Sequence, residues 1–409
     1  MNDPNTMVTL APVAAAKAPA IGLPGLSGVD PTALAEWLAG HDEPPYRARQ
    51  INEAVFGGAV GSIEAIATLP AGLRRDLAAA FRFDTLASTE VRVTDEGLTA
   101  KALHRLADGA LIESVLMHYP ARRGSRERHT VCISSQAGCA VGCPFCATGE
   151  LGFGRDLGTD EIVDQVRFAS ARLIAAGQRL TNIVFMGMGE PLLNLERVLA
   201  AIEALNDPHR FGLGARHITV STSGVVPGIQ RLTDLGPQFT LAVSLHAARD
   251  PLRDVLVPLN RRWPVAEVVA AAREHAAATG RRISYEVVMI AGINDTDVDA
   301  VAMADLLRGD HAHVNLIPMN PVAHTPWTAS PAPVIERFAA TLRAAGIQAT
   351  IRANRGVDVG AACGQLAAER AGEPPAPAVA RRRSRLIAES AAALLGQRSD
   401  APAPAGVGD

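Results

Sequence analysis

A regular alternation of strand-like and helix-like runs between residues 130 and about 350 is the feature that most limits how this chain of 409 residues can fold. Six such units predict a parallel sheet with crossover helices, and they are too few for an eight-fold barrel. We therefore expect an α/β fold built on an open, partial (β/α)6 barrel. The strands are expected at 129–134, 182–187, 217–222, 239–245, 283–290 and 313–318, and the helices at 159–176, 195–206, 227–235, 264–279, 296–308 and 332–345.

A cysteine-rich stretch, V-C-I-S-S-Q-A-G-C-A-V-G-C-P-F-C (131–146), begins in the first of these strands and contains four of the five cysteines. Loops at the carboxyl ends of barrel strands carry the chemistry in folds of this kind. Three of the cysteines have the spacing C-x3-C-x2-C, namely Cys139, Cys143 and Cys146. Three thiolates in a glycine-containing loop can hold an iron–sulfur cluster and leave one iron open for another ligand.

Two other uses of these cysteines are consistent with the spacing. A closed zinc site needs four ligands, and His129 or Cys363 could supply the fourth. Alternatively, Cys143 and Cys146 could form a redox dithiol.

Polar and small residues also follow the other strands. G-M-G-E-P (187–191) places two glycines and a carboxylate at a strand end, where a ligand could approach the backbone closely. A tight turn with a solvated glutamate would explain the same residues. Ser221, Ser244 and His246 lie at the ends of the next two strands and Asn320 follows the last strand, so the fold would arrange all of these groups around one cavity.

The motifs taken together resemble the RlmN family of radical S-adenosylmethionine (SAM) methyltransferases, from about residue 30 to residue 366. Members of this family methylate C2 of one adenine in 23S rRNA and, in dual-specificity members, of an adenine in tRNAs. The motifs that carry the resemblance are C-I-S-S-Q-A-G-C-A-V-G-C-P-F-C, G-M-G-E-P-L-L-N, T-V-S-T-S-G-V-V-P, S-L-H-A, N-L-I-P-M-N-P and A-A-C-G-Q-L.

The resemblance implies the cofactors and their ligands. Cys139, Cys143 and Cys146 would hold a single [4Fe-4S] cluster, and an electron-donor protein would reduce it. The residues that would contact SAM are Gly189, Glu190, Ser221, Ser244, Leu245, His246 and Asn320.

The resemblance also implies catalytic roles for three residues. Cys363 would be methylated by one SAM, and a radical made from a second SAM would take hydrogen from that methyl group. The carbon radical would add to adenine, and Cys132 would then attack the sulfur of Cys363 and release the product as a disulfide forms. Glu113 matches the family's proposed proton acceptor. From the sequence alone, Cys132 and Cys363 could also be two inert buried thiols.

Three other functions compete with this interpretation. A related enzyme that methylates adenine C8 in rRNA would use the same cysteines. A radical SAM activating enzyme acting on a protein would not need Cys132 and Cys363. A zinc-binding RNA protein would need no catalytic cysteine pair either.

Composition and patterning predict how the chain is divided. Residues 1–28 are rich in Ala, Pro and Gly and are expected to be disordered. Residues 29–85 have helical periodicity and are expected to form an accessory domain that could contact RNA, and 86–128 alternate as a β-hairpin extension. The barrel core and a catalytic C-terminal segment would occupy 129–370. A linker, a basic helix (381–390) and a disordered tail would follow in 371–409.

The overall charge and the cysteine content bear on location and partners. No apolar run reaches the roughly 18 residues of a membrane span, and five cysteines fit a reducing cytoplasm better than a disulfide framework. The net charge of −3 does not exclude RNA, because binding depends on local patches. We expect a cytoplasmic monomer that binds RNA through arginine clusters in 30–83, in the 121–128 loop and in 381–385.

Overall fold

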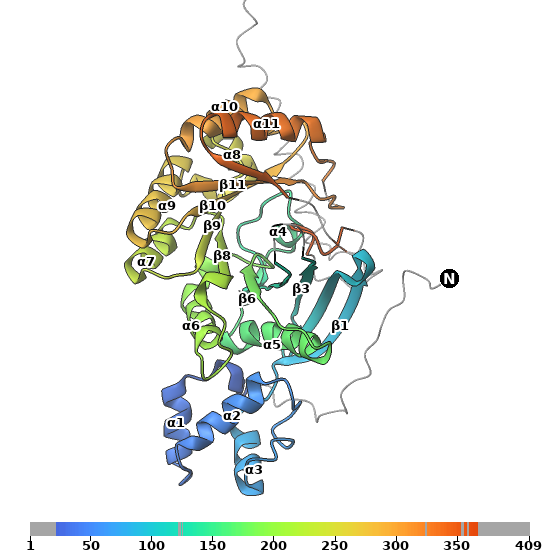
Figure 1. The fold of residues 1–409 in the computed structure, drawn as a ribbon, viewed down its shortest axis with the longest axis vertical. Coiled ribbons are helices and arrows are strands. Elements are labelled where there is room, and N and C mark those ends of the chain that lie inside the picture. The colour runs from blue at the N-terminus through green and yellow to red at the C-terminus, as the bar shows by residue number, and fades with distance from the viewer. Residues whose placement is uncertain are drawn as a thin grey trace, which may run out of the picture.

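One mixed sheet of ten strands forms the centre of the computed structural model, which describes residues 22–366 except 122, 123, 125, 324, 353–355, 358 and 359. The strand order is β1-β2-β3-β4-β7-β8-β9-β10-β11-β12 (Figure 1). From β4 onward all neighbours are parallel, which confirms the predicted α/β partial barrel. These strands are β4 (Arg128–Cys132), β7 (Asn182–Phe185), β8 (Ile218–Thr222), β9 (Thr240–Ser244), β10 (Ile283–Met289), β11 (Ala312–Pro318) and β12 (Gln348–Ile351).

The six crossover helices lie within a few residues of their predicted spans, because each has a long apolar face that packs on the sheet. Figure 1 shows them on the outside of the curved sheet. Shorter elements have too few residues to show a period, and the sequence did not reveal α4, α8, β5 or β6. The predicted helices are α5 (Thr159–Ala175), α6 (Leu195–Asn206), α7 (Val226–Leu235), α9 (Val265–Thr279), α10 (Asp297–Leu306) and α11 (Ala332–Ala344). The unpredicted elements are α4 (Ala147–Leu151), α8 (Asp250–Leu256), β5 (Gln136–Gly138) and β6 (Phe153–Asp156).

The β-hairpin extension is continuous with the barrel sheet. Strands β1 (Leu86–Thr94), β2 (Thr99–Leu106) and β3 (Leu111–Tyr119) form an antiparallel meander, and β3 pairs antiparallel with β4. The register of this last pair places Val115 opposite Cys132. Residues directly opposite one another share a face of the sheet, so side chains of the extension reach the site at the end of β4.

The barrel is open, since no pair joins β12 to β1 among the described strands. The described part of 356–366 lies across this opening, in red beside the ends of the β1–β3 meander in Figure 1. Gly356 donates its N–H to Asp95 Oδ2 at 2.9 Å, and Lys101 Nζ donates to the carbonyl of Gly360 at 3.1 Å. These two bonds hold the segment that carries Cys363 against the extension.

A small helical domain, comprising α1 (Pro31–Ala39), α2 (Tyr46–Phe56) and α3 (Ala71–Ala80), extends from one end of the molecule (Figure 1). Asp30 caps the first helix: its Oδ1 accepts from the N–H groups of Thr32 and Ala33 at 2.9 and 3.1 Å. Apolar residues at helical spacing, such as Leu34 and Leu38, are almost fully buried. Three helices therefore occupy the span 29–85, in which helical periodicity was expected.

The N-terminal segment departs from the prediction of disorder up to residue 28. Residues 1–21 lie outside the described residues, but Leu26–Gly28 form a 3-10 helix and the side chain of Leu26 is only 2% exposed. Gly25 also forms a β-bridge with Arg82. The prediction is wrong for 22–28 because composition does not reveal a single apolar anchor such as Leu26.

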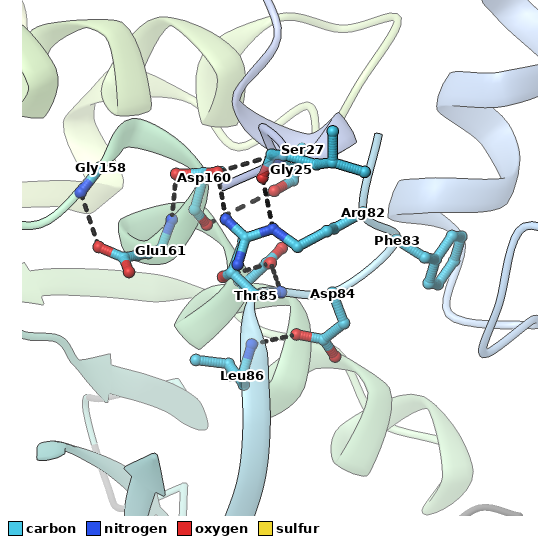
Figure 2. A network of polar contacts seen from close by, with 12 residues as sticks. Gly25, Ser27, Arg82, Phe83, Asp84, Thr85, Leu86, Gly158, Asp160 and Glu161 are labelled. Atoms are coloured by element: carbon cyan, nitrogen blue, oxygen red, sulfur yellow. Dashed lines mark hydrogen bonds and ion pairs between the residues drawn. The ribbon is translucent and has the colours of Figure 1, made fainter. Parts of the chain in front are cut away.

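A polar network joins this segment and the helical domain to the barrel (Figure 2). Asp160, in the first turn of α5, accepts the Gly25 N–H through Oδ2 at 2.7 Å and lies 3.6 Å from Arg82 Nη2. One turn later, Asp164 accepts from both the N–H and the hydroxyl of Thr85 at 2.8 and 2.7 Å. Two carboxylates of one barrel helix thereby fix the segment 22–28 and the entry to β1.

Some expectations fall on residues that are not described. The linker, basic helix and tail predicted for 371–409 lie outside the described residues, as do three positions of the 121–128 loop. In the described part of the chain, no helix combines the length and hydrophobicity needed to cross a membrane.

We predict that Asp160→Ala loosens the N-terminal segment selectively. Removing the carboxylate leaves the Gly25 N–H without its acceptor, which costs about 1–3 kcal/mol, so amide exchange in 22–28 should accelerate about tenfold or more. Hydrogen exchange with mass spectrometry measures this. Asp305→Ala, which breaks an exposed ion pair with Arg308, is the matched control. Equal protection of 22–28 in the two variants would contradict the role of Asp160.

Candidate active site

The cysteine loop is shaped by glycines that cannot be replaced without moving the backbone. Gly138 has φ +79°, and a Cβ on it would lie 1.9 Å from the carbonyl oxygen of Gly152. Cys139 donates its N–H to that carbonyl at 2.8 Å, and Cys146 donates to the carbonyl of Cys143 at 3.1 Å. The loop therefore folds back on itself and gathers the three predicted ligands.

The arrangement of the three sulfurs bears on what they could hold. A single tetrahedral zinc ion would bring thiolates to about 3.8 Å from one another. In the described chain, Cys139, Cys143 and Cys146 do not form a set whose sulfurs all lie within 4.8 Å of one another. Burial raises the pKa of Cys139 to about 12 and that of Cys143 well above its usual value, so the thiolates need a compensating positive charge. This donor set fits a larger, cationic iron–sulfur group better than one ion.

The G-M-G-E-P loop packs backbone to backbone against the start of the cysteine loop. Gly189 has φ +102°, and a Cβ there would lie 2.5 Å from Cβ and 2.7 Å from N of Gln136. Glu190 Oε2 accepts from the N–H and the hydroxyl of Ser223, both at 2.7 Å, and Oε1 accepts from Leu192 N–H at 3.0 Å. The carboxylate thus positions the loop, and its direct contact with SAM stays a prediction.

Ser221 and Ser244 end neighbouring strands, as predicted, and their hydroxyl oxygens lie 3.4 Å apart. Arg253 fixes the ends of these two strands. It is fully buried, and the sequence did not indicate its role. Its guanidinium donates to the carbonyls of Ser223, Ser244 and Leu245 at 2.7, 3.2 and 2.9 Å. Burial lowers the pKa of Arg253 to about 10, so it remains charged at neutral pH close to the cysteine loop.

His246 and Asn320 complete the ring of predicted contacts. His246 has φ +60°, and its Nδ1 accepts the N–H of Val288 at 3.1 Å while its ring meets Phe145 edge-on at 4.8 Å. Burial, with a contribution from Arg253, lowers the pKa of His246 to about 3, so the ring is neutral and Nε2 carries the proton. Asn320 donates to the carbonyl of Cys363 at 2.9 Å, and its buried Oδ1 has no hydrogen-bond partner among the described residues. That oxygen fits an acceptor for a polar ligand.

Cys132 and Cys363 line the same pocket, although 231 positions separate them (363 − 132). Cys132 is buried, and burial followed by the nearby Cys363 raises its pKa to about 12, while Arg352 opposes the shift. Cys363 is exposed. The remaining walls are largely apolar and are provided by Val115, Met117, Tyr119, Val184, Met186, Ala361, Ala362 and Leu366.

Glu113 lies on the same face of β3 as Val115, two residues away, and therefore on the face that carries Cys132. Its carboxylate is fully buried and forms an ion pair with Lys101 at 2.7 Å. Lys101 also holds the carbonyl of Gly360, which links Glu113 to the segment bearing Cys363. The sequence did not indicate Arg352, which lines the pocket, or Lys101, which pairs with Glu113, because only strand pairing and the return of the chain bring them to these places.

Comparisons with known proteins agree with this geometry. Residues 133–304, from the cysteine loop to α10, match the model of the radical SAM superfamily. A protein of Salinispora tropica named "Probable dual-specificity RNA methyltransferase RlmN" is 50% identical over 333 residues, which is 80% of this chain and 88% of the relative. A protein of Saccharopolyspora erythraea with the same name is 50% identical over 337 residues, covering 80% and 90% of the two chains.

The chain belongs to the RlmN family. A crystal structure of a radical SAM methyltransferase from Sphaerobacter thermophilus superposes with a TM-score of 0.81, at 48% identity, and covers 85% of this chain and all of that one. Membership of this family confirms the resemblance carried by the strand-end motifs, and it implies SAM and an iron–sulfur cluster as cofactors.

We predict that Gly189→Ala weakens SAM binding much more than does a Gly→Ala change at another position with positive φ. The added Cβ would collide with Gln136, and the positive φ adds strain, so the loop that carries Glu190 must move. Gly177→Ala is the matched control, because Gly177 also has positive φ (+69°) but a Cβ added there would meet no described atom within 4 Å; it should cost only about 1–2 kcal/mol of stability. Equilibrium dialysis with labelled SAM measures affinity, and equal affinity in both variants would contradict the close-packing argument.

Proposed function

We propose that this chain methylates C2 of a specific adenine in 23S rRNA, and of an adenine in tRNAs, by transfer through a methylated cysteine. The observation that carries the proposal is the pocket shared by Cys132 and Cys363, with the Glu113–Lys101 ion pair on the same face of the sheet. The names of the relatives, which specify a dual-specificity RNA methyltransferase, support RNA as the substrate.

The cysteine loop would bind the iron–sulfur cofactor. Cys139, Cys143 and Cys146 would bind one [4Fe-4S] cluster, and the SAM site would be built from the predicted residues at the strand ends, with Asn320 Oδ1 as one acceptor. When bound and reduced by a donor protein, the cluster supplies the electron that cleaves SAM to a radical able to remove a hydrogen atom.

Cys363 would serve as the methyl carrier. Adenine C2 is an electron-poor carbon without a nucleophilic lone pair, so direct transfer from SAM has no attacking group to use. A methyl group on the Cys363 sulfur can instead lose one hydrogen atom and join its carbon to C2. Cys363 is the exposed member of the pair, which suits a residue that must meet both SAM and the RNA base.

Glu113 and Cys132 would complete the reaction. The Glu113 carboxylate, which pairs with Lys101, accepts the proton that leaves C2, and the unpaired electron left on the adduct would return to the iron–sulfur group that Cys139, Cys143 and Cys146 would hold. The Cys132 sulfur then attacks the Cys363 sulfur, so that an S–S bond forms and the S–C bond breaks, and the released carbon takes a proton. The disulfide is transient in a reducing cytoplasm, where cellular thiols restore both cysteines.

The nearest competing function, methylation of adenine C8, would use the same cysteine pair. Mass spectrometry of nucleosides separates the two, since 2-methyladenosine and 8-methyladenosine elute differently at equal mass. A radical SAM activating enzyme would not need Cys132 and Cys363 in one pocket, and the shared pocket therefore favours a methyltransferase.

We predict that Cys132→Ala traps the RNA. The variant can accept a methyl group on Cys363 and add it to adenine, but no thiol remains to displace the Cys363 sulfur, so the carbon–sulfur link persists. Purified anaerobically with substrate RNA, it should migrate on a denaturing gel as a heavier species that nuclease converts to the unmodified position.

Two variants serve as controls for this experiment. Cys132→Ala/Cys363→Ala lacks the carrier, and Cys143→Ala should lose its iron; neither should form the adduct, although both should bind RNA. A Cys132→Ala protein that turns over normally and carries no RNA would refute the paired-cysteine mechanism.

A further inference from the structure

A second cluster of ligand-type side chains lies at the other end of the β3–β4 pair. His118 and His129 face each other across the two strands, and their rings stack with centroids 4.5 Å apart and planes inclined by 16°. Glu127 Oε1 lies 2.7 Å from His118 Nε2 and 3.9 Å from His129 Nε2. The three ligand atoms all lie within 4.8 Å of one another, a condition that no other group of at least three such side chains meets in the described chain.

His129 carries the observation that points to a ligand. Its side chain is only 6% exposed, and its buried Nε2 has no hydrogen-bond partner among the described residues. Burial lowers the pKa of His129, with a further lowering by His118, while Glu127 and a backbone hydrogen bond with Arg179 oppose the shift. The unpartnered Nε2 lies 3.9 Å from Glu127 Oε1, beside the stacked ring of His118.

We propose that His118, Glu127 and His129 form a binding site for a divalent transition-metal ion of the Zn²⁺ class. Two imidazole nitrogens and one carboxylate are ligands that Zn²⁺ prefers, and a backbone carbonyl on the remaining nitrogen of a ligating histidine is the usual arrangement. The site is separate from the cysteine loop and from SAM, and the inference goes beyond the proposed function.

Ion binding requires the ligand atoms to rearrange: the 2.7 Å between His118 Nε2 and Glu127 Oε1 must lengthen, and the stacked rings must tilt until both nitrogens point at one ion. Ligand atoms about 2.0–2.1 Å from a tetrahedral ion lie about 3.3 Å from one another, so the 3.9 Å gap between His129 and Glu127 must shorten slightly. Glu127 is half exposed (51%) at the entry to β4 and has room to rotate. A simple hydrogen bond between His118 and Glu127 would explain their 2.7 Å distance, but it would leave the buried Nε2 of His129 unsatisfied.

Such an ion would cross-link the two strands β3 and β4. It would join the end of β3 to the start of β4 and to Glu127, which directly precedes β4. The same two strands carry Glu113 and Cys132 toward their other ends. The bound ion would therefore stabilise the pairing register of β3 with β4, on which the catalytic pocket depends, without taking part in the reaction.

Zinc binding is tested in the full chain with its cluster assembled. All variants are made in a Cys132→Ala/Cys363→Ala background, called the parent, because the only thiols left in it are the three of the cysteine loop. After equilibration with Zn²⁺ and gel filtration, elemental analysis should find one zinc ion per chain with unchanged iron, and Zn²⁺ should raise the melting temperature.

The variants decide where the zinc binds. In the parent background, His129→Ala and Glu127→Gln should each weaken zinc affinity about tenfold or more and abolish the thermal shift, whereas His217→Ala, which removes an exposed imidazole elsewhere, should change neither. Glu127→Gln alters a half-exposed side chain and keeps the test valid if His129→Ala fails to fold. A parent that retains no zinc, or variants that bind it as tightly as the parent, would overturn the proposal.

Discussion

The antiparallel pairing of β3 with β4 is the contact on which the site depends. It joins the hairpin extension to the first barrel strand in a single sheet, and its register puts Val115 opposite Cys132. Because side chains alternate across a strand, the same register brings Glu113 to the face that carries Cys132. A shift by one residue would turn Glu113 and Val115 to the face opposite Cys132, so the placement of Glu113 beside Cys132 rests on one strand pairing.

Polar groups inside the barrel hold the strand ends in place. Arg253 joins the carbonyls of two strand ends, and the Glu190 carboxylate joins the end of β7 to the loop after β8. Buried charges of this kind are costly unless they are fully hydrogen-bonded, and these two make several bonds each. Satisfied networks of this type rigidify a site, which explains how a ring of loop residues can keep a defined cavity shape.

The sequence predicted the barrel because the period of each long element is visible in its own residues. It also predicted the cysteine loop and the strand-end motifs, since parallel strands place their carboxyl ends together. It did not reveal Lys101, Arg352 or Arg253, whose roles arise from pairing between distant segments, and it wrongly extended the disordered segment across Leu26. The His118–Glu127–His129 cluster was missed for the same reason, since cross-strand register rather than spacing brings its members together.

The measurement that tests transfer through Cys363 most directly uses SAM labelled with three deuteriums on its methyl group. If the methyl first joins the sulfur of Cys363, loses one hydrogen atom there and then adds to adenine, the RNA product must carry two deuteriums and one hydrogen at C2. Mass spectrometry of the digested RNA should therefore find 2-methyladenosine with two deuteriums. A product that keeps all three, or one methylated at another position, would contradict the account.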